Sequence, residues 1–327
     1  MNAGETAVVL FQLGGPDTLD AVEPFLYNLF CDPDIIDVPG AFLIRKMLAR
    51  LISSRRAPRV RELYRRIGGG SPILAQTTLQ ANRLREVLEA RGYPLSVYIA
   101  MRYWHPMTEE VYGRILDDGV KEVVLLPLYP QYSKATTGSS MKEWARIVRA
   151  SQRDILSVKA VESYYDNPLY VGALVQNINT SIAKVPADER GKVHLVFSAH
   201  GTPMKLVREG DPYSEHIEKT YQLVVKNGNF GLPHHLCFQS KIGPQRWLEP
   251  SLTGMIKNLA SQKVSHIIVV PMAFVTEHIE TLSEINIEAR EEAGALGIEY
   301  FDMMPALVAG EKFIACLADL VIEKLRN

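Results

Sequence analysis

Short apolar runs rich in β-branched residues alternate along the chain with longer stretches in which apolar residues recur at helical spacing. Six runs have the length and composition of strands, at residues 7–13, 95–100, 123–128, 193–198, 236–238 and 264–270. Runs that are apolar on both faces suit parallel strands covered by helices on each side. The alternation therefore predicts an α/β fold with mainly parallel sheets flanked by helices.

The length of the chain and the grouping of these runs predict two domains. A chain of 327 residues exceeds one ordinary compact domain, and the six runs form two groups of three. We expect domains at 1–165 and 166–327, with the join near 164–169. The last stretch, 310–325, has helical apolar spacing and is a candidate to pack back on the first domain.

Charge and cysteine content limit the classes of partner and compartment. The 36 basic and 37 acidic residues nearly cancel, so no overall field favours nucleic acid. The three cysteines are dispersed and odd in number, which fits a reducing compartment better than a disulfide framework. With no export signal and no 18-residue apolar run, we expect a cytoplasmic protein, with attachment to the inner membrane surface left open.

His200 is the first candidate for chemistry, because functional groups in open α/β sheets gather beyond the carboxyl ends of strands. It follows the fourth predicted strand, where Gly201 and Pro203 break the run. An imidazole, with an unperturbed pKa of about 6.5, accepts protons readily at neutral pH. His200 is therefore either a general base or a histidine that only hydrogen-bonds the turn.

Glutamates recur at helical spacing after the sixth predicted strand. Spacings of three, four and four residues place four of them within about 80° on one face of an α-helix. Such a row suits a cation or protons in transit if it is buried, and a solvated helix face if it is not. The four are Glu277, Glu280, Glu284 and Glu288.

Two loops, at 68–72 and 136–140, combine glycine with hydroxyl residues and suit an anion, although neither carries a nucleotide-binding fingerprint. Arginine and tyrosine side chains lie near both loops in sequence, and these groups suit carboxylates. The alternatives are ordinary loops and a solvated basic face. The side chains concerned are Arg55, Arg56, Tyr64, Arg65, Arg102 and Tyr103.

Taken together, the motifs resemble those of the ferrochelatase family over nearly the whole chain. Each motif alone is weak, but the ordered set is specific. They are LGGP at 13–16, YRRIGGGSP at 64–72, RY and HP at 102–106, YPQYS at 129–133, TTGSS at 136–140, FSAH at 197–200, GDPY at 210–213, QSKIGP with WL at 239–248, and HIETL at 278–282.

This resemblance implies two Rossmann-like, chelatase-like domains that enclose a porphyrin cleft. It makes His200 and Glu280 the catalytic pair, and adds Glu277, Glu284 and Glu288 as an acidic relay for metal or protons. Family members often carry Asp at position 277, so the geometry there is open. The porphyrin-binding residues that it implies are Leu13, Arg55, Arg56, Tyr64, Arg65, Ser71, Arg102, Tyr103, Tyr132, Ser133, Trp247 and His278.

The activity implied by the resemblance is insertion of Fe(II) into protoporphyrin IX in haem biosynthesis, with release of two protons. Porphyrin and ferrous iron are then the substrates, and His200 accepts pyrrole protons. Three alternatives stay open: a coproporphyrin ferrochelatase, a cobalt or nickel chelatase for a related tetrapyrrole, and a non-catalytic tetrapyrrole-binding protein. An acidic relay behind an axial ligand would have no purpose in the last.

No permanently bound cofactor is expected. Animal ferrochelatases hold an iron–sulfur cluster with one internal cysteine and three near the C-terminus. Here Lys134 occupies the internal position and no cysteine follows Cys316, so no cluster is expected. We expect Cys31 and Cys316 to be small buried apolar residues.

The segment 43–52 is basic and amphipathic. Helical projection sets its apolar residues opposite Arg45, Lys46 and Arg50, and the apolar ones are Leu43, Ile44, Met47, Leu48, Leu51 and Ile52. The segment resembles the apolar lip of membrane-associated ferrochelatases, which implies attachment to an anionic membrane surface. Alternatively, its apolar side packs on the first domain.

Overall fold

The computed structural model describes residues 4–35, 44–151, 157–241 and 245–326. The chain divides into two compact units. Unit 1 comprises Met1–Ser163 together with Ile314–Asn327, and unit 2 is Tyr164–Phe313. The division falls at the start of the expected join, and the last segment belongs to unit 1.

Unit 1 contains a four-stranded parallel sheet in the order β2-β1-β3-β4. Its strands are β1 (Thr6–Gln12), β2 (Ser96–Met101), β3 (Glu122–Pro127) and β4 (Ser157–Ala160). Its helices are α1 (Val22–Cys31), α2 (Arg45–Arg66), α3 (Ile73–Ala90), α4 (Thr108–Asp117), the π-helical η1 (Lys134–Gly138), α5 (Ser139–Ala150) and α11 (Glu311–Arg326).

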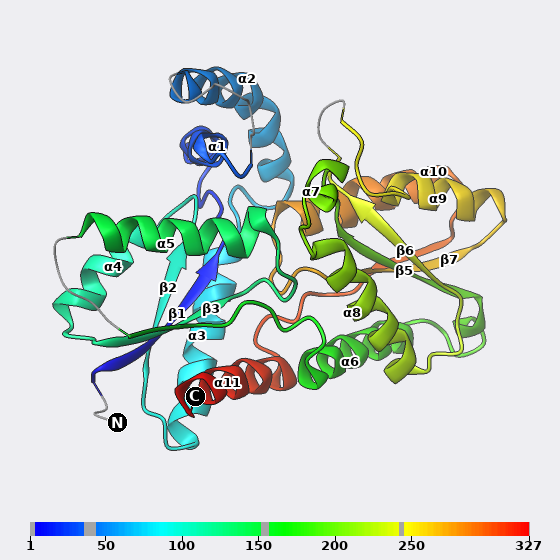
Figure 1. The fold of residues 1–327 in the computed structure, drawn as a ribbon. Coiled ribbons are helices and arrows are strands. Elements are labelled where there is room, and N and C mark those ends of the chain that lie inside the picture. Colours follow the sequence, from blue (N-terminus) through cyan, green and yellow to red (C-terminus); the bar gives the residue numbers. More distant parts are fainter. Residues whose placement is uncertain (1–3, 36–43, 152–156, 242–244, 327) are drawn as a thin grey trace. The chain divides into compact units, whose positions relative to one another are not determined.

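Helices cover both faces of this sheet, with α4 and α5 on one side and α3 and α11 on the other (Figure 1). All seven residues of β1 are buried, as expected for a central strand between two helix layers. Trp144 of α5 packs its ring edge-on against Phe11 of β1 and Tyr112 of α4, with ring centroids 5.9 and 5.4 Å apart. These aromatic contacts form part of the core between the sheet and helices α4 and α5.

Unit 2 repeats the arrangement with a parallel sheet in the order β6-β5-β7-β8. Its strands are β5 (Val193–His200), β6 (His234–Gln239), β7 (His266–Pro271) and β8 (Tyr300–Met303). Its helices are α6 (Pro168–Lys184), the 3₁₀ turn η2 (Arg190–Lys192), α7 (Met204–Arg208), α8 (Tyr213–Gly228), α9 (Leu252–Ser261), the π-helical η3 (Glu280–Ala289) and α10 (Arg290–Ala295).

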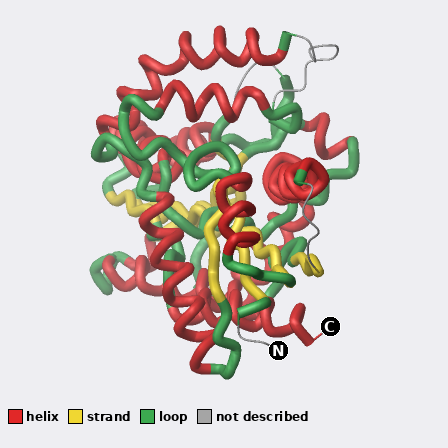
Figure 2. Tube along the Cα trace, turned by 90° about the vertical axis from the view of Figure 1, so that its left-hand side faces the viewer, coloured by secondary structure: helices red, strands yellow, loops and turns green. Residues whose placement is uncertain are grey.

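The second sheet is also a middle layer. Helices α9 and α10 lie on one side of it, with α6 and α8 on the other (Figure 1), and helices border the strands in the turned view of Figure 2. The buried core on the α9 side joins Val196 of β5, Ile256 of α9 and Ile285 of η3. This face matters for function because η3 packs on it.

The predicted fold class is confirmed, and all six predicted strands are present. The two missed strands, β4 and β8, have only four residues each and form an edge of their sheets. In β4 no side chain is fully buried, so the strand lacks the apolar run that marks the others. Strands of only four residues are too short to show a clear apolar run, so the sequence marks them weakly.

A buried carboxylate fixes the end of α1 against the rest of unit 1. Asp32 directly follows α1 and is 3 % exposed. Its Oδ2 accepts hydrogen bonds from Arg102 Nη2 and the Tyr103 hydroxyl, both at 2.7 Å, and from the hydroxyl of Ser139. Burial opposes the charge, but the Arg102 charge and the two hydroxyls outweigh it and hold the pKa of Asp32 below its usual value.

Replacing Asp32 should therefore destabilise the protein in a pH-dependent way. We expect Asp32→Asn to lower the free energy of unfolding by about 3 kcal/mol at pH 7, because Arg102 loses its buried partner. A carboxyl with a lowered folded-state pKa stabilises above its unfolded value of about 3.9, and this contribution is lost as pH falls through the folded value. Denaturant unfolding at pH 7 and pH 3 measures both effects.

Asp34→Asn is the matched control for this variant. Asp34 pairs with Lys142 at 2.6 Å on the surface, and such exposed pairs contribute about 1 kcal/mol or less. A loss for Asp32→Asn no larger than that of the control, or one independent of pH, would contradict the anchoring role.

Candidate active site

The carboxyl end of β5 carries an imidazole facing a carboxylate. His200 is the last residue of β5 and Glu280 the first of η3, and Nε2 lies 3.3 Å from Oε1. Nδ1 of His200 lies 2.6 Å from the carbonyl oxygen of Gly201. A carbonyl only accepts, so Nδ1 carries a proton and Nε2 is the nitrogen directed at Glu280. About a third of each side chain is exposed, so the pair reaches solvent.

A second imidazole flanks the same carboxylate. His278 Nε2 lies 3.7 Å from Glu280 Oε2, and the backbone N–H of Thr281 donates to His278 Nδ1 at 3.3 Å. In the neutral ring, the proton therefore sits on Nε2 and faces Glu280. Glu280 thus lies between two imidazoles from different segments of unit 2.

These contacts set the charge of each group. Burial opposes ionisation of Glu280, but the charge and hydrogen bond of His200, with His278 adding to them, lower the pKa of Glu280 to about 2. Burial likewise opposes the charged form of His200, yet Glu280 raises the pKa of His200 to about 9. Burial lowers the pKa of His278, so this ring is neutral. At neutral pH the site holds one imidazolium–carboxylate pair beside a neutral imidazole.

The expected row of four glutamates on one α-helix is wrong in two respects. The helix begins at Glu280, so Glu277 precedes it, and the winding from Glu280 to Ala289 is that of a π-helix. Hydrogen bonds in a π-helix span five residues, so α-helical projection does not describe this face. Glu277 Oε1 instead accepts the backbone N–H of Ala306 at 2.7 Å.

The two later glutamates differ in burial. Glu284 is half-buried, and burial together with the nearby Glu280 charge raises its pKa despite its bonds to Ser240. Glu288 is exposed and accepts from the Ser283 hydroxyl at 3.1 Å. The alternative of a solvated helix face therefore describes Glu288, but it does not describe Glu280 and Glu284, which are partly buried.

The predicted metal ligands, His200, Glu277, Glu280, Glu284 and Glu288, do not form a compact cage. Within the described residues, no three His, Cys, Asp or Glu side chains converge closely enough to hold a metal ion. Of the five, His200 and Glu280 pair with each other, whereas Glu277, Glu284 and Glu288 bond to other residues. Their part in iron transit stays a prediction.

Three residues that the sequence analysis did not single out position the acidic groups. Ser240 has φ of +66°, and in this left-handed conformation its backbone N–H reaches Glu284 Oε1 at 2.6 Å while its hydroxyl donates to Oε2. Ser198 donates to Gln239 Oε1 at 2.7 Å, and Gln239 Nε2 donates to the Glu280 carbonyl at 3.3 Å. Their sequence signal was the motif at 239–248 for Gln239 and Ser240 and the motif at 197–200 for Ser198, since serine and glutamine by themselves mark no chemistry.

Tyr213 and Trp247 complete this part of unit 2. Tyr213 is 7 % exposed at the start of α8, and burial raises its pKa, with the Glu280 charge adding to the effect. Trp247 packs on the turn after His200, because a Cβ added to Gly201 would lie 3.4 Å from its ring and 2.8 Å from the Gln239 carbonyl. Gly201 is therefore required by close packing. Of the predicted porphyrin ligands, Trp247 and His278 are the two in unit 2.

In unit 1, Leu13 and Ser71 belong to two loops that pack tightly together. The Ser71 N–H donates to the Pro16 carbonyl at 2.7 Å, and a Cβ on Gly15 would lie 2.6 Å from the Ser71 hydroxyl. Glycine at position 15 is thus needed for the loops to approach. The loop that contains Leu13 directly follows the carboxyl end of β1, where functional groups were expected.

The predicted arginines and tyrosines of unit 1 fall into exposed and buried groups. Arg55 and Arg65 are exposed on α2, and Arg65 pairs with Glu62 at 2.7 Å. The guanidinium of Arg56 lies 5.5 Å from the Phe30 ring centroid. Tyr132 is half-buried. These four side chains keep part of their surface accessible.

Several of the predicted hydroxyls are buried or bound within the protein. Tyr64, Tyr103 and Ser133 are each 2 % exposed or less, and the Tyr103 hydroxyl and Arg102 are bound to Asp32. The segment 136–140 is wound into η1 and the start of α5, with the Ser139 hydroxyl also given to Asp32. Of the hydroxyl residues in this segment, Ser139 thus serves a carboxylate of the protein itself, and an anion-binding role for the segment stays a prediction.

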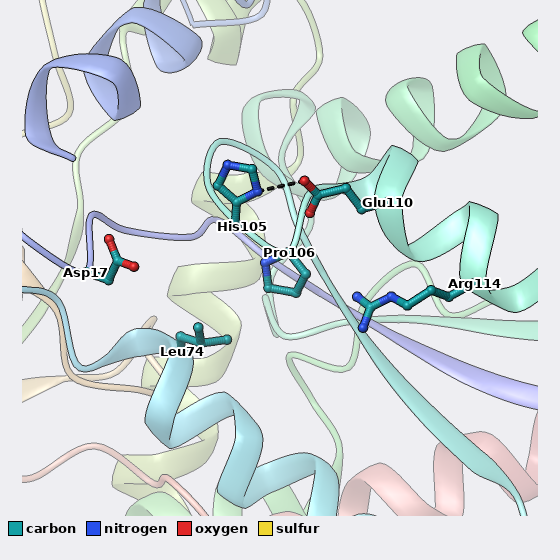
Figure 3. A pocket seen from close by; sticks show the side chains of 6 residues that line it. All are labelled: Asp17, Leu74, His105, Pro106, Glu110 and Arg114. Carbon is teal, nitrogen blue, oxygen red and sulfur yellow. Dashed lines mark hydrogen bonds and ion pairs between the residues drawn. The ribbon is translucent and has the colours of Figure 1, made fainter.

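A hollow of about 550 Å³ on unit 1 lies apart from the predicted residues (Figure 3). In it, His105 Nδ1 and Glu110 Oε1 are 2.7 Å apart, and both side chains are about half exposed. The lining residues are Asp17, Leu74, His105, Pro106, Glu110 and Arg114. None of them belongs to the predicted site, so the hollow adds nothing to its chemistry.

Cys237 and Cys316 are buried, whereas Cys31, expected to be buried, is only partly so. None of the three forms a disulfide within the part of the chain that the structure describes. No helix in the described ranges is long and apolar enough to cross a bilayer.

The two helix-flanked parallel sheets place the protein in the chelatase class of folds. SirB from Bacillus subtilis, solved with Fe³⁺, superposes with a TM-score of 0.55 at 13 % identity, over 76 % of this chain and 89 % of that one. The sirohydrochlorin chelatase SirB from B. subtilis subspecies spizizenii, in complex with cobalt, gives 0.55 at 10 % identity, over 99 % and 96 % of the two chains.

Sequence similarity narrows the class to one family. The ferrochelatase family model matches residues 5–325. The ferrochelatase of Aquifex aeolicus is 45 % identical over 96 % of this chain and 97 % of its own, and that of Geotalea uraniireducens is 46 % identical over 97 % of each. The chain belongs to the ferrochelatase family, and the protein is a metal chelatase, a lyase that inserts metal into a porphyrin for haem synthesis.

The charge state of the His200–Glu280 pair is directly testable. We expect the pKa of His200 to be about 9 in the unmodified protein, and to fall by more than one unit in Glu280→Gln, because burial then acts without the opposing carboxylate. NMR titration of ring-labelled histidine in the metal-free protein measures it. Glu288→Gln, at the exposed position, should leave the value unchanged. Equal titration in all three proteins would contradict the pairing.

Proposed function

We propose that the protein inserts Fe(II) into protoporphyrin IX with release of two protons. The observation that carries this proposal is the half-buried His200–Glu280 pair at the carboxyl end of β5, at 3.3 Å, in a chain of the ferrochelatase family. Metallation replaces two pyrrole N–H protons by the metal, so a base beside the macrocycle is required. His200 Nε2 is the base in this proposal.

The raised pKa of His200 adds a condition to the mechanism. At neutral pH the pair already holds a proton, so His200 must lose it before it accepts one from a pyrrole. A divalent cation approaching the pair lowers the pKa of an imidazolium by repulsion and so favours this loss. The incoming iron thereby helps to create the base that its own insertion needs.

Glu280 and the later glutamates give the released protons an outward path. The pKa of Glu280 is about 2, so its carboxylate stays ionised at neutral pH. It therefore stabilises the imidazolium of His200 without binding the released proton itself. Glu284, with its raised pKa, binds a proton more readily, and Glu288 is exposed to water. In this proposal protons pass along the order His200, Glu284, Glu288, with Glu280 as the fixed charge beside the first step.

Porphyrin binding is proposed for accessible side chains rather than for the full predicted set. Trp247 packs beside Gly201 and His278 lies against Glu280, so both flank the pair in unit 2. In unit 1 the exposed guanidinium groups of Arg55 and Arg65 suit propionates, and Leu13 supplies an apolar contact. The reaction as written uses side chains and the two substrates, with no permanently bound cofactor.

We further propose that α2 attaches the protein to an anionic membrane surface on the cytoplasmic side. Helix α2 buries its small residues Ala49, Ser53 and Ala57, while Met47 stays 69 % and Leu51 46 % exposed. This burial pattern disfavours the alternative in which the apolar side packs inward. Basic residues beside this apolar surface each contribute up to about 1 kcal/mol near anionic lipid. They are Arg45, Lys46 and Arg50.

His200→Ala should reduce metal insertion by at least about a hundredfold, because general-base catalysis contributes 10²- to 10⁴-fold. Porphyrin binding and the unfolding midpoint should change little, since the side chain is only part-buried at a strand end. The absorbance change on incubation with porphyrin and Fe(II) measures turnover, and porphyrin fluorescence measures binding. The control is His105→Ala, on the surface of unit 1. Near-normal turnover by a folded His200→Ala protein would remove His200 from the mechanism.

Membrane attachment should depend on the exposed apolar residues of α2. We expect Met47→Glu/Leu51→Glu to lose co-sedimentation with vesicles of phosphatidylserine and phosphatidylcholine, because two carboxylates oppose both burial and the anionic surface. Leu79→Glu is the matched control, since Leu79 is 48 % exposed on α3. Attachment that persists in the double variant, or that is lost equally in the control, would contradict this role.

Substrate choice separates protoporphyrin from coproporphyrin. A membrane-presented substrate is the more apolar porphyrin, so we expect kcat/KM for protoporphyrin IX to exceed that for coproporphyrin III by tenfold or more. Spectrophotometric turnover with each porphyrin, with and without vesicles, gives the ratio. A clear preference for coproporphyrin without vesicle binding would assign the enzyme to the coproporphyrin-dependent branch.

A further inference from the structure

Histidines gather at the amino end of the unit 2 sheet, opposite the end that carries His200. Four of the eight histidines of the chain lie on the first two residues of β5, β6 and β7. They are His194, His234, His235 and His266. His194 and His200 are six residues apart on β5, so this end lies about 20 Å from the catalytic pair. The mechanism uses none of these four side chains.

Two of the four meet across neighbouring strands. His235 is in register with Val196, so it lies diagonally beside His194 on the same face of the sheet. Nδ1 of His194 and Nε2 of His235 are 3.0 Å apart, and the rings are within 7° of parallel with centroids 5.3 Å apart. Both side chains are half-buried at the rim and reach solvent. Their facing nitrogens share one hydrogen, which one ring donates to the other.

The other two histidines have different partners. His234 Nδ1 lies 2.7 Å from the Tyr221 hydroxyl, and His266 is 2 % exposed and bonds to Ser265 and Glu189. Only His194 and His235, within this set, direct nitrogens at each other. Burial lowers the pKa of both, and neighbouring histidines lower that of His235 further, so both rings are neutral at pH 7. Neutral imidazole is the form that binds metals.

The separation of the two nitrogens matches one coordination geometry. With metal–nitrogen bonds of about 2.0–2.1 Å, nitrogens 3.0 Å apart subtend an angle of about 94° at the metal. That is the angle between neighbouring ligands in a tetragonal or octahedral complex, whereas a tetrahedral angle requires a separation of about 3.3 Å. Tetragonal sites with nitrogen ligands favour Cu(II) or Ni(II), and imidazole sites bind Cu²⁺ most tightly of the divalent series.

We propose that His194 and His235 form a peripheral two-histidine site for a divalent transition metal, with Cu²⁺ bound most tightly and water completing its coordination. Binding needs each ring to turn by about 40°, so that both lone pairs aim at one ion. The hydrogen between the rings moves to the outer nitrogen of its own ring by exchange with water. Both rings are neutral before and after the metal binds, so binding releases no net proton.

The test is a titration of the full-length protein with Cu²⁺ alone, by calorimetry and by electron paramagnetic resonance. We expect the unmodified protein to bind one more equivalent of Cu²⁺ than H194N/H235Q. The paramagnetic resonance signal of this additional Cu²⁺ should show coupling to nitrogens of two imidazoles. Asn and Gln place an amide where each ring nitrogen lay, so the variants retain a hydrogen bond across the strands but lose the ligands. Each single variant should weaken this equivalent by tenfold or more.

Two controls make the result decisive. H234Q removes the adjacent imidazole and should bind Cu²⁺ as the unmodified protein does. Copper that binds at the catalytic pair is common to all these proteins and cancels in the comparison, and normal iron-insertion turnover by H194N/H235Q shows that the variant is folded. Equal copper equivalents in the unmodified protein and the double variant would overturn the proposal. Loss of the same equivalent in H234Q would overturn it as well.

Discussion

The carboxylate of Glu280, held between two imidazoles, is the interaction on which the rest of the site depends. It keeps a charge in a partly buried place because His200 lies 3.3 Å from one oxygen and His278 3.7 Å from the other. The backbone arrangement serves this contact: β5 ends at His200, η3 begins at Glu280, and Gln239 on the neighbouring strand bonds to the Glu280 carbonyl. A single ion pair thereby joins the strand ends of the sheet to the acidic helix.

The layers of the fold could be read from the sequence because buried parallel strands leave a continuous apolar run. Where burial is incomplete the signal is lost, as in β4, whose four residues lie at a sheet edge. The winding of η3 could not be read for a different reason. A π-helix and an α-helix of the same residues differ in their hydrogen-bond partners, and the sequence of Glu280–Ala289 does not distinguish them.

The candidate site was predictable to the extent that topology determines it. Parallel strands end at one edge, so a histidine at the end of one strand and a glutamate after its neighbour in the sheet can meet there. Arg102 and Tyr103 show what residue type alone leaves open. Guanidinium and phenol groups suit any carboxylate, and residue type does not tell a propionate from the buried Asp32 that they bind. The burial of Asp32 depends on the packing of α1, which no local pattern records.

The path of the chain through unit 1 has a consequence for its synthesis. Helix α11 contributes Leu317, Val321 and other buried residues to that unit, and Asp319 pairs with Arg91 at 2.5 Å. These residues leave the ribosome only after Tyr164–Phe313 has been made, which at roughly 5–20 residues per second is a delay on the order of ten seconds. During that interval unit 1 exposes the apolar surface that α11 later covers. The unit whose synthesis begins first is therefore the last to be complete.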